Sequence, residues 1–209
     1  VNDSSYGETL LSICKEQNIR MVISLNDLEL PILAEYRARF FREGVVVVVS
    51  SSKVIATCFD KWETFKFAQN NNINVPQTFL AIDAALKALE TGLLTFPVVV
   101  KPRWGTASIS IEVCRDLEEL NLAYKLTRKR LPHTMLADVG STDPDRIVLI
   151  QEMLCGVEYG LDVINDLDGR YACTFVKRKI TMRAGETDRA ITTENIDLKN
   201  LGRKIGECL

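Results

Sequence analysis

The sequence has few of the residues that simple metal centres and redox sites use. It contains one histidine, His133, in a polar stretch, and its 6 cysteines include no Cys-x-x-Cys pair. Zinc sites usually draw several cysteine or histidine ligands from short spacings, so this composition argues against such a site. The cysteines stand mostly among apolar neighbours, at positions 14, 58, 114, 155, 173 and 208. We expect reduced, buried thiols rather than a disulfide framework.

The sequence also lacks an excess of charge of one sign. Lys plus Arg number 26 and Asp plus Glu number 28, which gives a formal net charge of -2. Without a basic excess the chain has little general attraction for nucleic acid or for an anionic membrane surface. No apolar run approaches the roughly 20 residues that span a bilayer, and we expect no signal peptide. These absences predict a cytoplasmic protein that binds neither nucleic acid nor membrane.

The 209 residues, 46% of them hydrophobic, suffice for one large or two small domains. Residues 1–50 show helical patterns over 8–17 and 28–41 and strand patterns over 21–25 and 45–49. Five consecutive valines end this region and predict a strand that is buried on both faces and parallel to its neighbour. Strand, helix and strand form a right-handed crossover unit. Two parallel strands do not close a doubly wound core, so we expect residues to be missing upstream.

The pattern after residue 50 changes to antiparallel α+β. Asp60 with Glu63, and Asp116 with Glu119, have the capping-box spacing that begins a helix. We expect helices over 53–59, 61–69, 82–91, 116–130 and 198–208, and extended segments over 75–80, 96–100, from 109, 147–150, 158–164 and 171–180. Residues 131–146 and 182–188 are polar and are expected to be loops.

The segment FPVVVKPRWGTASISI, residues 96–111, is the most informative part of the chain. A buried strand is followed by Lys101 and Arg103 and then by the small-residue turn Gly105-Thr106-Ala107-Ser108. Small residues let backbone N–H groups approach an anion, and lysine supplies a point charge for phosphate oxygens. An ordinary hairpin with a flexible tip has the same pattern, because short glycine motifs often arise by chance. The segment alone leaves both interpretations open.

Two further features indicate the same chemistry. Lys61 directly follows the capping Asp60, and the strand ending in Gln151-Glu152 has Glu158 six residues beyond it. A nucleotide needs cations for its phosphates, an apolar slot for its base and a carboxylate for its ribose hydroxyls. The alternative for Lys61 is a solvated first-turn lysine, although the positive end of a helix disfavours one. The alternative for Glu158 is a surface carboxylate of a strand.

With these motifs in order, the chain resembles the ATP-grasp superfamily, and specifically its carbamoyl phosphate synthase large-subunit-like branch. The resemblance covers nearly the whole chain and rests on Asp60-Lys61, FPVVVKPRWGTAS at 96–108, IQEMLCGVEYGLDV at 150–163 and MRAGETDRA at 182–190. It implies an α/β plus α+β fold, the end of a pre-ATP-grasp Rossmann-like domain followed by an incomplete ATP-grasp domain. The implied parts are a partial α/β domain, linking helices, the lid subdomain and the start of the C-terminal subdomain, at 1–50, 51–74, 75–150 and 151–209.

The resemblance also implies a nucleotide site. Its phosphate-binding positions match two lysines and a lid loop with less glycine than usual: Lys61, Lys101 and Gly105-Thr106-Ala107-Ser108. Its adenine-binding strand, which acts mostly through backbone groups, matches Gln151, Glu152, Met153 and Leu154. Its ribose-binding carboxylate matches Glu158. Lys177 or Lys179, together with Arg183, would face phosphate or substrate.

The implied reaction is that of an ATP-dependent ligase. A small carboxylate or bicarbonate attacks the γ-phosphate of ATP to give an acyl phosphate and ADP, and an amine-type nucleophile then displaces phosphate. The family's Mg²⁺ ligands lie on later acidic positions, including a Glu-x-Asn-Pro-Arg type segment that this sequence lacks, so no metal or catalytic residue is assigned. Because Mg²⁺ neutralises charge during phosphoryl transfer, we expect this chain alone to be an inactive part of a parent cut at both ends. Open edges at such cuts would favour a homo-oligomer.

Two other classes of function stay open from sequence. One is a non-catalytic nucleotide-binding or interaction module, or one half of a split subunit that meets its metal-bearing half in trans. The other is a plain doubly wound α/β domain without ATP, against which the antiparallel pattern after Val75 counts. The sequence does not name the acceptor substrate.

Overall fold

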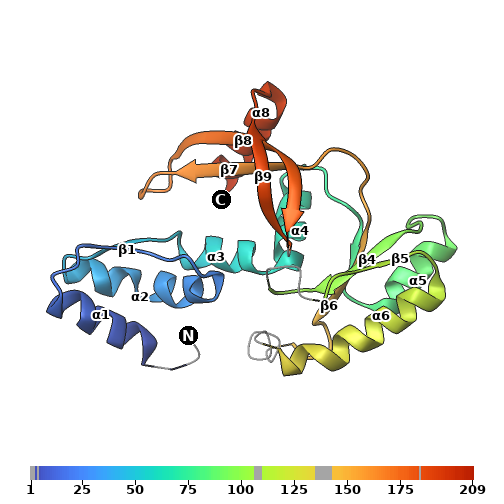
Figure 1. Cartoon of the computed structure of the whole chain (residues 1–209), viewed down its shortest axis with the longest axis horizontal. Coiled ribbons are helices and arrows are strands. Elements are labelled where there is room, and N and C mark those ends of the chain that lie inside the picture. The colour runs from blue at the N-terminus through green and yellow to red at the C-terminus, as the bar shows by residue number, and fades with distance from the viewer. Residues whose placement is uncertain (1–2, 4, 106–109, 135–142, 184) are drawn as a thin grey trace. The chain divides into compact units, whose positions relative to one another are not determined.

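The computed structural model describes residues 3, 5–105, 110–134, 143–183 and 185–209 (Figure 1). The chain forms two compact units. One comprises Val1–Phe59, Leu161–Val176 and Glu194–Leu209, and the other comprises Asp60–Gly160 and Lys177–Thr193. None of the helices within the described ranges has the length and apolar composition needed to cross a membrane.

The first unit begins with the expected α/β pattern. Strands β1 (Met21–Ile23) and β2 (Val46–Val48) are parallel, as predicted. The helical elements around them are α1 (Tyr6–Glu16), η1 (Asp27–Glu29), α2 (Leu30–Arg42) and α3 (Ser52–Phe59). Leu11, Leu33, Phe40 and Val47 are among the side chains that form their core. The expectation of a strand buried on both faces is wrong for Val48, which is 39% exposed, because the described residues contribute just two strands to this sheet.

A second sheet has the order β7 (Tyr159–Asn165), β8 (Tyr171–Arg183) and β9 (Glu186–Thr192), with β8 and β9 antiparallel. The prediction of a loop over 182–188 is wrong, since β8 continues to Arg183 and β9 begins at Glu186. Both strands are largely exposed there, so no apolar alternation marks them. Helix α8 (Ile196–Cys208) packs closely on β8 through Gly202, where an added Cβ would lie 2.4 Å from Thr174 Oγ1.

The second unit contains the expected antiparallel module. Its sheet has the order β3 (Thr78–Phe79), β6 (Val148–Glu152), β4 (Val98–Pro102) and β5 (Glu112–Cys114), and every pairing is antiparallel. Helices α5 (Ile82–Glu90) and α6 (Leu117–Arg130) cover one face, and η2 (Leu131–His133) follows α6 (Figure 1). Helix α4 (Lys61–Asn70) opens the unit. The core lies between the sheet and its two helices.

Both predicted helix caps are present. Asp116 accepts a hydrogen bond from Glu119 N at 2.8 Å, and Glu119 in turn accepts one from Arg115 N at 2.6 Å, which completes a reciprocal capping box. Such a cap contributes about 1 kcal/mol of stability. At α4 only the first half forms, because Asp60 accepts from Glu63 N at 3.4 Å while Glu63 pairs with Lys66 instead.

The cysteines are all free thiols, as expected. The expectation that they are buried is correct for Cys14 and Cys114 and wrong for three others, which are exposed: Cys58, Cys155 and Cys208. Apolar sequence neighbours do not decide which face of an element a residue occupies.

Candidate functional site

Lys61 is placed by the helix cap that precedes it. Asp60 accepts hydrogen bonds from Trp62 N at 2.9 Å and Glu63 N at 3.4 Å, and α4 therefore begins at Lys61. The Lys61 ammonium donates to the Gly105 carbonyl at 2.7 Å. Gly105 has a φ of 115°, a backbone value that glycine adopts without a Cβ clash. The cap and the glycine thus bring this lysine to the base of the 96–111 hairpin.

Lys101 lies on the face of β4 that points away from the helices. Val98 and Val100 are fully buried on the core side, so Val99 and Lys101, which alternate with them, occupy the other face. Lys101 Nζ donates to Gln151 Oε1 at 2.6 Å. Gln151 is opposite Val99 on β6, which makes it a diagonal neighbour of Lys101. Antiparallel pairing therefore positions this contact.

Among the described residues, both lysine ammonium groups donate to neutral oxygens. The part of the chain that the structure describes places no carboxylate within ion-pair distance of either ammonium. Burial, and then the charge of Lys101, lowers the pKa of Lys61 to about 8, although Asp60 acts in the opposite direction. Burial also lowers the pKa of Lys101. Such shifts mean that the surroundings disfavour the cations, so an added anion would stabilise both.

Arg103, by contrast, is buried and fully paired. It is 8% exposed, its Nε donates to both Asp60 oxygens at 2.9 Å and its Nη1 donates to Asp143 at 2.9 Å. Its guanidinium also stacks on the Trp104 ring at 4.4 Å. The Arg103 carbonyl accepts the Lys61 N–H at 3.2 Å. Sequence reasoning noted Arg103 only as a cation and missed this anchoring role, since Asp60 and Asp143 are distant in the sequence.

Glu158 belongs to a second cluster, beside the start of β7. Its carboxylate accepts from Lys179 Nζ at 2.6 Å, and its carbonyl accepts from Lys179 N at 3.0 Å. The Glu158 side chain is 64% exposed. A Cβ built on Gly160 would lie 3.8 Å from Cε of both Lys177 and Lys179, so the two lysines flank the same backbone. The structure brings together Glu158, Lys177 and Lys179.

The four residues predicted to contact adenine fall into two groups, with Gln151 and Glu152 in β6 and Met153 and Leu154 after it. Glu152 ties β6 to the residue before β3, because its carboxylate accepts Gln77 N at 3.0 Å and its N–H donates to the Gln77 carbonyl at 2.8 Å. Met153 and Leu154 follow as an apolar linker, 38% and 64% exposed. The structure thus gives Gln151 and Glu152 side-chain contacts that the sequence did not reveal.

The other predicted site residues lie apart from these clusters or outside the described residues. Arg183 is exposed at the end of β8, opposite Glu186 of β9. It is four residues from Lys179, about 13 Å along a strand. Thr106, Ala107 and Ser108 lie outside the described residues.

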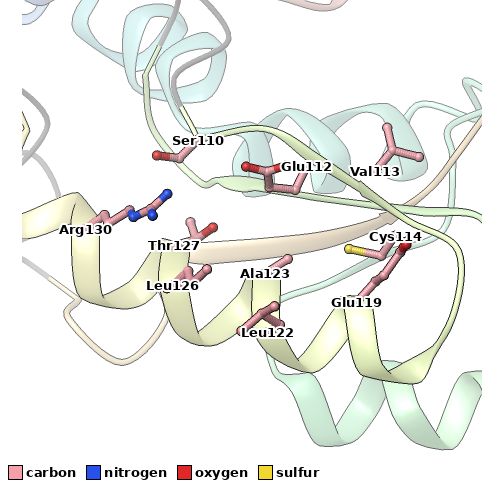
Figure 2. A pocket seen from close by; sticks show the side chains of 10 residues that line it. All are labelled: Ser110, Glu112, Val113, Cys114, Glu119, Leu122, Ala123, Leu126, Thr127 and Arg130. Carbon is pink, nitrogen blue, oxygen red and sulfur yellow. The ribbon is translucent and has the colours of Figure 1, made fainter.

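A separate cavity of about 300 Å³ lies between β5 and α6 (Figure 2). Cys114 and Thr127 line it. Cys114 is opposite Val98 in the strand register, on the core side of the sheet, whereas Lys101 occupies the other face. Burial, and then the nearby carboxylates, raises the pKa of Cys114 to about 11, which keeps this thiol protonated at neutral pH. The cavity is distinct from the lysine cluster.

Fold and site together define an α/β unit joined to an antiparallel α+β unit with a desolvated lysine pair. Residues 94–201 match the sequence profile of the ATP-grasp domain, and residues 1–48 match that of the PylC-like N-terminal domain. The first match covers more than half of the 209 residues, and the chain belongs to the ATP-grasp family. No curated protein sequence gives a significant match.

Solved structures share the fold at low sequence identity. The biotin carboxylase domain dimer of Hydrogenobacter thermophilus 2-oxoglutarate carboxylase, in complex with MgADP, ADP and bicarbonate, is 12% identical with a TM-score of 0.75 and covers 97% of this chain and 45% of that chain. A biotin carboxylase–β-γ-ATP complex from Campylobacter jejuni is 13% identical (TM-score 0.71; 100% and 47% covered). An L-amino acid ligase from Bacillus licheniformis is 16% identical (TM-score 0.69; 98% and 49% covered). The chain spans less than half the length of each of these proteins.

Proposed function

We propose that this chain supplies the nucleotide-binding part of an ATP-dependent ligase. Lys61 and Lys101 would hold the phosphates, with Gly105 and the residues after it as the lid loop. Gln151, Glu152, Met153 and Leu154 would contact adenine, mostly through backbone groups, and Glu158 would contact the ribose hydroxyls. Lys177 and Arg183 would serve phosphate or substrate. The reaction would activate a small carboxylate or bicarbonate as an acyl phosphate for attack by an amine-type nucleophile.

One observation carries the proposal: Lys61 and Lys101 are partly buried, the charge of Lys101 acts on Lys61, and among the described residues each ammonium donates to a neutral oxygen rather than to a carboxylate. Two desolvated cations that lie close together do not stabilise a protein, since each one raises the free energy of the charged form of the other. A polyphosphate would offset both costs at once through charge-assisted hydrogen bonds. The donor set therefore fits an anionic nucleotide.

The chain's own residues would act by position and charge. Lys61 and Lys101 would stabilise negative charge on the phosphate oxygens while the acyl phosphate forms. When bound, Mg²⁺ would supply positive charge to the phosphates, but no group of three His, Cys, Asp or Glu side chains gathers as a metal site within the described ranges. We therefore assign no metal step to this chain. One neighbouring structure contains MgADP, ADP and bicarbonate, which supports this ligand class.

We further propose that the 209-residue chain binds nucleotide but does not turn it over, either as part of a longer ligase or as one half of a split subunit. The carbamoyl phosphate synthase-like branch, the cytoplasmic location, the homo-oligomer and the boundaries at residues 50, 74 and 150 remain predictions. An assay of ADP release with Mg²⁺ and candidate carboxylates tests the catalytic part. Sustained turnover by this chain alone would contradict it.

Binding itself is tested by titration calorimetry with the non-hydrolysable ATP analogue AMP-PNP. Replacing either lysine by methionine removes a charge-assisted contact and should weaken binding about 10- to 100-fold. Lys125→Met, an exposed lysine on α6, is the matched control and should leave the affinity unchanged. If Lys61→Met and Lys101→Met bind as tightly as the unmodified chain, the lysine pair is not the phosphate site.

A further inference from the structure

Three hydrogen bonds run in series from Lys101 across the sheet to the start of β3. Lys101 Nζ donates to Gln151 Oε1 at 2.6 Å, Gln151 Nε2 donates to Thr78 Oγ1 at 2.7 Å, and Thr78 Oγ1 donates to the Pro76 carbonyl at 2.9 Å. Thr78 is 4% exposed, so its hydroxyl is screened from water. Thr78 and Gln151 are directly opposite each other in the register. The series is therefore held by the strand pairing.

The direction of the series is fixed at both ends. An ammonium only donates and a carbonyl only accepts, so each intermediate group must accept on the Lys101 side and donate on the Pro76 side. With the opposite amide orientation, Gln151 Nε2 would face the Lys101 ammonium, donor against donor. Thr78 disfavours this arrangement because its hydroxyl donates to the Pro76 carbonyl. The hydroxyl oxygen can then only accept from Gln151, which requires that Gln151 Nε2 face Thr78. Thr78 thus selects the orientation of the Gln151 side chain.

The residue that holds Lys101 is also uncharged. A carboxylate at the position of the Gln151 amide would neutralise the ammonium and repel a phosphate. A neutral amide oxygen orients the ammonium and leaves its full charge for a ligand. Gln151 and Thr78 therefore determine where the ammonium lies, and Lys101 alone supplies the positive charge.

We propose that Thr78 is a positioning residue for nucleotide phosphates, acting through Gln151 on Lys101. Thr78 itself contacts no phosphate. The inference rests on the proposed function, and it extends that function to a residue outside the lysine pair that no sequence motif indicated. It implies that the affinity for the polyphosphate, but not for the nucleoside, depends on a buried hydroxyl.

The variants Thr78→Val and Thr78→Ser test the proposal. Valine has nearly the same shape without the hydroxyl, so Thr78→Val should weaken AMP-PNP binding about 5- to 15-fold, whereas adenosine binding changes less than twofold. Thr78→Ser restores the hydroxyl and should bring AMP-PNP affinity to within about twofold of the unmodified chain. A merely structural role would weaken both ligands in parallel with the loss of thermal stability. That parallel loss would overturn the proposal.

Thr127→Val is the matched control, because Thr127 is equally buried, at 2% exposed, but lies on α6 on the core side of the sheet. It should not change the ratio of AMP-PNP to adenosine affinity. A second variant, Gln151→Glu, places a carboxylate against Lys101 and should weaken AMP-PNP binding by at least tenfold without weakening adenosine binding. Retained AMP-PNP affinity in Gln151→Glu would also overturn the proposal.

A measurement without nucleotide separates this proposal from the proposed function. NMR titration of the Lys101 side chain should show a lower Lys101 pKa in Thr78→Val than in the unmodified chain, because the ammonium loses a well-oriented acceptor. Thr78→Ser should show no such change. If this result holds but the unmodified chain does not bind AMP-PNP, the proposed function fails and the hydrogen-bond series stands. If the unmodified chain binds AMP-PNP and Thr78→Val leaves both affinity and pKa unchanged, the positioning role fails.

Discussion

Arg103 and Asp60 form a buried two-point ion pair, in which Nε donates to both carboxylate oxygens at 2.9 Å and Nη2 donates to Oδ2 at 2.7 Å. The pair joins the end of β4 to the first turn of α4. Lys61 is the residue after Asp60, and Lys101 lies two residues before Arg103. The proposed phosphate site is therefore assembled around an ion pair that is not itself available to a ligand.

Removal of Arg103 should destabilise the protein and the site together. Arg103→Ala leaves the Asp60 carboxylate buried without its partner, which typically costs about 3–5 kcal/mol. Urea denaturation should show this loss, and AMP-PNP binding should weaken because Lys61 is no longer fixed. Arg128→Ala removes an exposed arginine on α6 and should cost less than about 1 kcal/mol. A loss no larger in Arg103→Ala than in this control would show that the pair does not anchor α4.

Nucleotide binding should weaken as the pH rises through about 8. Lys61 has its pKa lowered to about 8, first by burial and then by the charge of Lys101. It is therefore protonated and able to bind phosphate below that pH, and it loses its charge above it. Calorimetry with ADP at pH 7 and pH 9 should show a fall of up to about tenfold per unit above pH 8. Because arginine stays charged at pH 9, the affinity of Lys61→Arg for ADP should not fall above pH 8 through loss of this side-chain charge. The pH dependence that arises from titration of the nucleotide itself should be the same in both proteins.

Glu158→Gln should remove the preference for ribose hydroxyls. A carboxylate accepts hydrogen bonds to hydroxyls more strongly than an amide oxygen does, so its loss should weaken ATP binding about tenfold. The change should be small for 2′,3′-dideoxy-ATP, which lacks both hydroxyls. Glu186→Gln alters an exposed carboxylate on β9 and serves as the control. Equal effects of Glu158→Gln on both nucleotides would argue that Glu158 only pairs with Lys179.

Gly202→Ala should destabilise the first unit. An added Cβ would lie 2.4 Å from Thr174 Oγ1, and Thr174 is only 5% exposed, so it cannot move freely. Overpacking of this kind costs about 1–3 kcal/mol. Asn200→Ala, at an exposed position of α8, should be nearly neutral. The double variant Gly202→Ala with Thr174→Ala should recover part of the lost free energy of unfolding. If the effects of the two substitutions on that free energy simply add, the contact between these residues does not cause the destabilisation.

Local patterns were sufficient for much of the fold. The Asp116 and Glu119 spacing located the start of α6, and the valine run located β2, because caps and strand propensity act within a few residues. The polar stretch at 182–188 was misassigned as a loop because β8 and β9 are largely exposed and carry no alternating apolar signal. The predicted order of domains came from the family resemblance, because local spacing alone does not predict it.

The sequence by itself determined that Lys61 follows a helix cap, that Lys101 adjoins a run of buried strand residues and that both belong to an ATP-grasp chain. Only the tertiary structure showed that Arg103 is paired with Asp60 and Asp143. It also showed that the Gln151 amide oxygen accepts from Lys101 while the Gln151 amide nitrogen donates to Thr78. The physical reason is the range of the interactions. Caps and strand periodicity act between residues a few positions apart, whereas the hydrogen-bond partners of Lys61 and Lys101 are Gly105 and Gln151, which lie 44 and 50 positions away in the sequence.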